Sequence, residues 1–276
     1  ITPAALSGIE TINLTLNGGA VNGSNITGVT TIGIADSVAN GLGVITNMPS
    51  SVTKVNQTTD MGVVSIGYAA GATTNLTLDF DAAGQNITNA STTINNAGGS
   101  LTIDGDVTRN VDLTSLVAGA STSIIISAED GDLLTGNITA AKATSLTVND
   151  KAGVAGAVTL GTVGAAALST LDVNNAGTGV MTLGAITGSR AMGTGKIDLD
   201  ATSTGRVIVG NITATAGAAG APSVDIDIDY TGLNAAANTI GNIDLGTTGS
   251  ISEFNYNRGA GTQSDTVGTI TALNVN

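Results

Sequence analysis

Apolar and polar positions alternate in short runs that recur along this chain. A triplet of the form apolar–x–apolar returns at intervals of about 22 to 29 residues. Its copies are Leu101–Ile103, Ile124–Ile126, Leu146–Val148, Leu171–Val173, Ile197–Leu199, Ile226–Ile228 and Phe254–Tyr256, with less regular copies upstream at Leu14–Leu16, Val52–Val55 and Leu76–Leu78. A period of two is typical of a strand with one buried face. The triplets therefore predict a series of short β-strands.

A second motif, Gly–x–apolar, lies between the triplets. Its copies begin at Gly136, Gly161, Gly184, Gly210, Gly241 and Gly268. Leu160 and Val163 flank one copy and are three positions apart, so a flat strand would place them on opposite faces. Glycine permits a positive φ. We therefore expect a corner at each copy, which turns both apolar residues inward.

A repeat of two or three short strands cannot bury its own apolar face, so successive repeats must stack. We predict an all-β fold: a right-handed parallel β-solenoid (β-helix) with coils of about 22–30 residues and a continuous core of Val, Ile and Leu. The alternative is a set of β-sandwich domains, because turn signals every 8 to 12 residues or so would also fit them. The interval of the repeat favours the solenoid.

The pattern divides the chain into two regions. Residues 1–70 follow it least, and we expect an irregular N-terminal β cap or lobe there. Residues 71–276 are predicted to be solenoid repeats. The repeat is still running at the last residues, so we expect this chain to be a segment of a longer protein.

Composition and charge exclude several classes of function. The chain has no His, Cys or Trp, and its 8 basic residues against 21 acidic ones give a net charge of −13. Histidine-based catalysis, thiolate chemistry and structural zinc are therefore ruled out. Nucleic-acid binding lacks a basic patch, and no apolar run is long enough to insert into a membrane. Paired carboxylates can hydrolyse glycosides, but no aromatic platform flanks them here, so we expect no enzyme.

Acidic residues recur at outward positions of the triplets and beside turns. The central residue of three consecutive triplets is Asp172, Asp198 and Asp227. Stacked strands would hold these carboxylates about 5 Å apart, which is unfavourable unless a cation bridges them. Calcium binds carboxylate and carbonyl oxygens, and the candidate ligands are Asp104, Asp106, Glu129, Asp130, Asp132, Asp198, Asp200, Asp225, Asp227 and Asp229. The alternative is a solvated acidic face that keeps a β-rich protein soluble.

Four segments carry a resemblance to a known family. Residues 134–140 (LTGNITA), 145–149 (SLTVN), 158–161 (VTLG) and 170–179 (TLDVNNAGTG) resemble bacterial surface-layer (S-layer) proteins of the type I-secreted, RTX-related kind. The bias to Gly, Ala, Thr and Asn, the acidic charge and the lack of Cys are similar too. The glycine-rich calcium-binding nonapeptides of that family do not occur in this sequence.

The resemblance implies a structural protein outside the cell, secreted and self-assembled into an S-layer lattice. Its expected partners are copies of itself and a cell-envelope polysaccharide or lipopolysaccharide, with calcium as a possible cofactor. The alternative is a secreted adhesin or autotransporter-type β-helical stalk that presents a binding domain.

Overall fold

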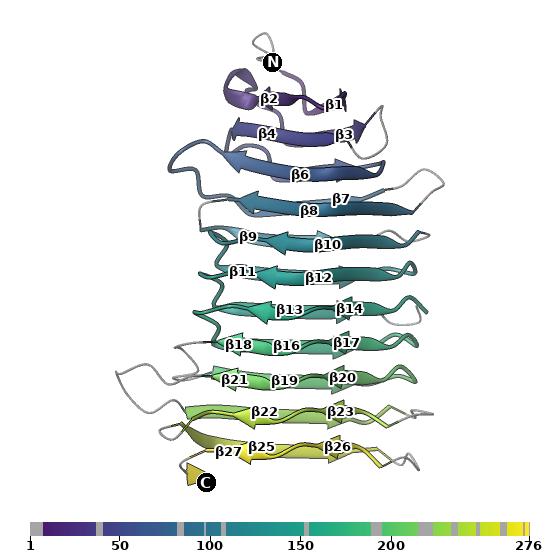
Figure 1. Ribbon diagram of the computed structural model, residues 1–276, viewed down its shortest axis with the longest axis vertical. Helices are drawn as coiled ribbons and strands as arrows, with labels where there is room; N and C mark the ends of the chain where they lie inside the picture. The colour runs from purple at the N-terminus through teal and green to yellow at the C-terminus, as the bar shows by residue number, and fades with distance from the viewer. Residues whose placement is uncertain are drawn as a thin grey trace.

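The structure, a computed structural model, is a stack of parallel strands in two sheets (Figure 1). It describes residues 8–36, 41–81, 86–96, 98–105, 109–151, 155–188, 195–214, 223–232, 237–246, 249–259, 264–272 and 274–275. Within these ranges the chain forms strands and one short 3-10 helix, η1 (Gly23–Asn25), and no α-helix. No described helix is long and apolar enough to cross a membrane.

The first sheet contains one strand from each coil, 12 in all. In order they are β1 (Thr11–Leu16), β3 (Thr31–Asp36), β5 (Lys54–Gln57), β7 (Leu76–Phe80), β9 (Ser100–Asp104), β11 (Ser123–Ala128), β13 (Ser145–Asp150), β16 (Thr170–Asn175), β19 (Gly195–Ala201), β22 (Ser223–Tyr230), β25 (Ser250–Arg258) and β28 (Asn274–Val275). Register partners are 20 residues apart at Thr11 and Thr31, and 29 apart at Asp198 and Asp227. The predicted parallel β-solenoid is confirmed.

The second sheet has 16 strands, and it divides into two arms in the later coils. Its main path is β2 (Ala20–Asn22), β4 (Leu42–Met48), β6 (Met61–Tyr68), β8 (Ile87–Asn95), β10 (Val111–Val117), β12 (Leu133–Thr139), β14 (Val158–Leu160), β17 (Met181–Leu183), β20 (Val207–Val209), β23 (Thr239–Ile240) and β26 (Thr266–Val267). The second arm is β15 (Val163–Gly164), β18 (Ile186–Gly188), β21 (Ile212–Ala214), β24 (Ile243–Asp244) and β27 (Ile270–Thr271). Strands β1–β6, from the region expected to form a cap or lobe, lie in the same two sheets as the later strands.

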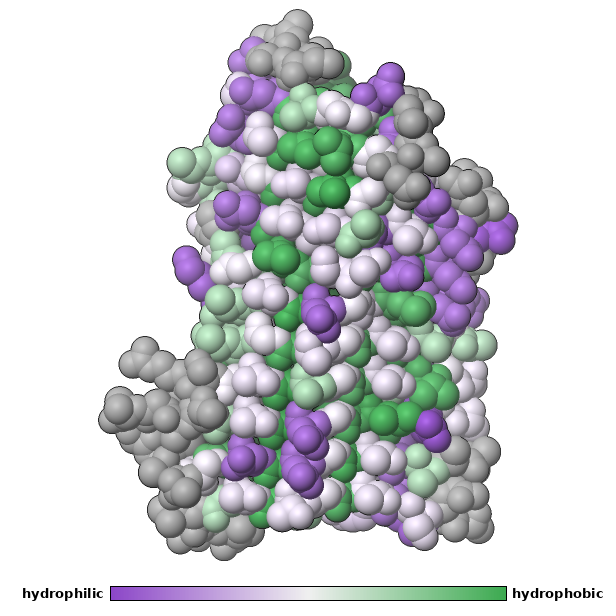
Figure 2. Space-filling view, viewed as in Figure 1, coloured by the Kyte–Doolittle hydropathy of each residue, from purple (hydrophilic) through white to green (hydrophobic). Residues whose placement is uncertain are grey.

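The core lies between the sheets and is built from columns of like residues. In β13, Leu146 and Val148 are buried, and Thr147 between them is half-exposed. The same alternation holds in the strands on either side, so each inward residue contacts its register partner above and below. Figure 2 shows the outcome on one face, where residues of similar hydropathy follow one another in columns along the long axis.

Close packing between successive coils explains the glycines at the corners. The prediction that these glycines have a positive φ is wrong. The described glycines with positive φ are Gly8, Gly18, Gly28, Gly71, Gly98 and Gly246, and none of these begins a Gly–x–apolar motif. Instead, the corners stack directly on one another. A Cβ at Gly184 would lie 2.6 Å from the carbonyl oxygen of Gly161, and one at Gly210 would lie 2.8 Å from the carbonyl carbon of Gly184. The corner column therefore has no room for a side chain.

Two buried amides tie the sheets together in the N-terminal half. Gln57 Nε2 donates to Asn89 Oδ1 (2.7 Å), and Asn89 Nδ2 donates back to Gln57 Oε1 (2.9 Å). Both side chains are fully buried, and they belong to different sheets. Reciprocal pairing of this kind satisfies polar groups that would otherwise destabilise the core.

Replacing Gly184 by alanine tests the corner packing. We expect Gly184→Ala to lower the free energy of unfolding by about 1–3 kcal/mol, because the added methyl group forces two coils apart. Urea unfolding followed by circular dichroism measures this. The control is Gly119→Ala, where a Cβ would meet nothing within 4 Å. Equal midpoints for the two variants would contradict close packing at the corners.

Candidate functional site

The outer face of the first sheet becomes acidic in the C-terminal half. Asp172, Asp198 and Asp227 are successive register partners on β16, β19 and β22, so their predicted stacking is confirmed. In the neighbouring strands the same column holds neutral residues, Thr147 on β13 before Asp172 and Asn255 on β25 after Asp227. Parallel strands hold partners about 4.8 Å apart, so three carboxylates repel one another along the stack.

Lys196 partly compensates this charge. Its Nζ atom contacts Asp198 Oδ2 and lies 3.9 Å from Asp227 Oδ2. The hydrogen bond to Asp198 is the main cause of a raised pKa for Lys196. The ammonium group is about half-exposed, so this pairing contributes little to stability.

A second acidic column runs beside the first. Asp200 on β19 and Asp229 on β22 are register partners, flanked by Asn174 and Asn257. Burial, followed by the charges of Asp198 and Asp229, raises the pKa of Asp200 to about 6. The two columns and Asp225, which accepts a hydrogen bond from Ser252 Oγ, form what we call the acidic face: Asp172, Asp198, Asp200, Asp225, Asp227 and Asp229.

The acidic residues of the turn before β12 bond to the neighbouring coils. Glu129 forms an ion pair with Lys151. Asp130 Oδ1 accepts a long hydrogen bond from the Ala155 N–H (3.4 Å), and Asp132 Oδ1 accepts one from the Ala157 N–H (2.8 Å). These carboxylates join one coil to the next through protein donors. They have a structural role whether or not a metal binds.

Asp104 belongs to neither group, although the charge of Lys151, the partner of Glu129, acts on it and partly offsets the rise in its pKa that burial causes. It ends β9 and is the register partner of Asp79 on β7. Burial, followed by the charge of Asp79, raises the pKa of Asp104. Lys54 Nζ lies 2.5 Å from Asp79 Oδ2 and screens this pair. Asp106, the other candidate in this segment, lies outside the described residues.

Among the residues that the structure describes, no group of three or more acidic side chains is placed to hold a metal ion. Each acidic column presents one carboxylate per coil at a flat surface. Calcium needs six to eight oxygens, so a calcium ion on the acidic face would also need oxygens from water or from a second molecule. Calcium binding at these positions stays a prediction.

Sequence analysis did not single out Asp150 and Asn175, which are buried polar residues on adjacent strands of the first sheet. The alternation of residues along β13 carries a signal that could have found Asp150. Leu146, Val148 and Asp150 share one parity, so a period of two places Asp150 on the inner face with the two apolar residues. Its carboxylate is therefore inside the core. The acidic candidates named from the sequence were all expected at outward positions or beside turns.

Fold and surface together define a β-solenoid repeat protein with a polar exterior and an acidic half. Comparison of the chain with protein-family models, with curated proteins and with solved structures finds no match. The functional argument therefore depends on the chain's own residues.

The raised pKa of Asp200 makes stability depend on pH. A carboxyl group whose pKa is higher in the folded state binds more protons there, so stability falls as pH rises from about 4 through about 6. We expect the urea midpoint to be higher near pH 5 than near pH 8, and Asp200→Asn to reduce the difference. The control is Asp112→Asn on the second sheet, which should leave the difference unchanged. A midpoint that rises towards alkaline pH would contradict this account.

Proposed function

We propose that this chain is a structural cell-surface protein that self-assembles into an S-layer lattice, in which the solenoids stack end to end. One observation carries the proposal: the described stack exposes apolar side chains at inward positions of β25 and in a hollow beside β1, where a further coil would cover them. Another copy of the chain can supply that coil. Head-to-tail contacts of this kind are heterologous, and they extend into rows when the rotation between copies does not close a ring.

The C-terminal end exposes positions whose register partners in the preceding coil are core. Phe254 and Tyr256 on β25 are 37% and 41% exposed, whereas their register partners Ile226 and Ile228 on β22 are 1% and 0% exposed. Burying two aromatic side chains is a large favourable term in association. A further coil in register, from a second copy or from a continuation of this chain, would cover both.

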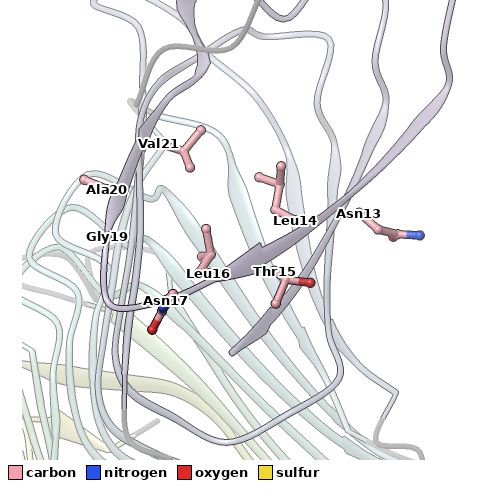
Figure 3. A pocket seen from close by; sticks show the side chains of 8 residues that line it. All are labelled: Asn13, Leu14, Thr15, Leu16, Asn17, Gly19, Ala20 and Val21. Atoms are coloured by element: carbon pink, nitrogen blue, oxygen red, sulfur yellow. The ribbon is translucent and has the colours of Figure 1, made fainter. Parts of the chain in front are cut away.

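The N-terminal end has a matching hollow between β1 and β2, with a volume of about 380 Å³. Figure 3 shows Leu14, Leu16 and Val21 facing this space, while Asn13 points away from it. Because the described strand pairs of the first sheet are parallel, β1 of one copy can continue this sheet after the last described coil of another. Aromatic side chains at one end and an aliphatic hollow at the other favour this arrangement.

Rows need side contacts to become a lattice. The outer faces offer Thr and Asn side chains, and the acidic face offers carboxylates that calcium could bridge between copies. The likeness to S-layer proteins supports the same assembly, with secretion and a position outside the cell. Under this proposal the anchor is a cell-envelope polysaccharide or lipopolysaccharide.

A stalk of a secreted adhesin or autotransporter is the alternative. It would use the same rod to hold a binding domain away from the cell, and it would remain a single particle. Both proposals assign the chain a structural role and no enzymatic one.

Negative-stain electron microscopy of the purified chain, with millimolar calcium and with a chelator, tests the proposal. We expect ordered sheets or rows, and sheets that dissolve in chelator would assign calcium to the side contacts. Phe254→Lys should abolish end-to-end order because it places a charge in the apolar contact. Thr147→Lys, midway along the rod, is the matched control and should keep end-to-end order. Single rods under both conditions would contradict the lattice and favour the stalk.

A further inference from the structure

Asp150 is a carboxylate inside the solenoid core. It is the last residue of β13, shares the inner face with Leu146 and Val148, and is 3% exposed. It is also the single charged residue among the buried side chains of the described chain. Burying an ionised carboxylate without compensation is strongly unfavourable, so something must balance this charge.

The protein itself does not balance it. Within the described residues, no donor meets hydrogen-bond geometry with Oδ1 or Oδ2 of Asp150. The neighbouring Lys151 backbone N–H only partly offsets the rise that burial causes in the pKa of this carboxyl group.

Several other buried polar side chains are satisfied: Gln57 pairs with Asn89, and Asn96 accepts a hydrogen bond from Ser121 (2.6 Å). Among the described residues Thr135 Oγ1 and Tyr230 OH also lack a partner, but each is a single neutral hydroxyl. Native cores leave few polar groups unpaired. Two unpaired oxygens on one carboxylate therefore point to a ligand.

A third unpaired oxygen belongs to the next coil. Asn175 is the register partner of Asp150 and is fully buried, and its Oδ1 atom has no partner among the described residues. The orientation of this amide is fixed, because Asn175 Nδ2 donates to the carbonyl oxygens of Gly179 (3.1 Å) and Arg206 (3.0 Å). Flipping the amide would turn its oxygen towards two acceptors. Figure 1 shows β13 and β16 as neighbours in the stack.

Among the ion pairs of the described residues, none joins a basic side chain to Asp150. Lys151, the next residue in the chain, pairs with Glu129. Burial, followed by the charge of Asp130, raises the pKa of Asp150 to about 7, with a partly opposing effect of the Lys151 backbone N–H. A proton on Asp150 could donate one hydrogen bond and would leave at least one of the three oxygens unpaired. A cation can contact all three.

We propose that Asp150 and Asn175 form a buried calcium site, in which both Asp150 carboxylate oxygens and Asn175 Oδ1 are ligands. Backbone carbonyl oxygens of the turn after β16, or water, complete the coordination. Gly177 in this turn packs against the carboxylate: a Cβ there would lie 2.6 Å from Asp150 Cγ. The site lies within one chain, so it is independent of the lattice and of the acidic face.

Thermal unfolding of the full chain, stripped with a chelator and then supplied with calcium chloride, tests the site. Calcium at about 100 times its dissociation constant should raise the folded-to-unfolded ratio about 100-fold. Asp150→Asn should lose this gain, and in chelator it should be at least as stable as the wild type because the buried charge is gone. Asp172→Asn, on the acidic face, is the matched control and should keep the full gain. The readout is single-chain stability, so failure of the lattice proposal would not affect it.

A second variant keeps the test decisive if Asp150→Asn does not fold. Asn175→Asp places two carboxylates in register, so it should be less stable than the wild type in chelator and recover more with calcium. Equilibrium dialysis with radioactive calcium should show one bound ion fewer for Asp150→Asn than for the wild type. An unchanged calcium gain in Asp150→Asn would overturn the proposal. A wild type that gains no stability from calcium would also overturn it, and an acid gain that Asp150→Asn removes would then assign a proton to Asp150.

Discussion

Each coil of this protein is held by the coils before and after it, through parallel strand pairing at a spacing of about 4.8 Å. A coil on its own leaves its apolar residues uncovered, so the fold exists only as a stack. The fixed spacing makes every position of a coil face its counterpart in the next. Apolar residues form columns inside, corner glycines lie against corner glycines, and Asp172, Asp198 and Asp227 form an acidic column outside. Favourable and unfavourable contacts are therefore both repeated along the rod.

The sequence predicts the stack well because alternation of apolar residues is a direct record of the inner columns. The triplets from Leu101 onward mark the strands of the first sheet, and the outward stacking of Asp172, Asp198 and Asp227 follows from them. The early coils were harder to see, since Gln57 occupies an inner position of β5 and pairs with Asn89 across the core. The role of the corner glycines could not be predicted, because contact between corners depends on how closely two coils approach. Corner glycines that touch are more than 20 residues apart in the sequence, so the sequence alone does not show their contact.

The same register that builds the core limits what the molecule can do. Its sides are polar columns, and the described stack leaves Phe254 and Tyr256 exposed on β25 and Leu14, Leu16 and Val21 around a hollow beside β1. These features support assembly between copies. Asp150 and Asn175 interrupt the apolar columns with unpaired oxygens, which favours a cation inside the rod. Both proposals follow from positions where the repeat is broken.

Pulsed electron–electron resonance between spin labels tests the stacked register most directly, because a chain without cysteine accepts paired cysteine labels cleanly. Thr77, Asp172 and Asn255 belong to one outer column of the first sheet, linked through successive register partners. At about 4.8 Å per coil, the backbone separation is about 19 Å for Thr77 with Asp172 and about 34 Å for Thr77 with Asn255. Measured distances that grow by this increment per coil would support the account. Distances that do not increase with the number of intervening coils would contradict it.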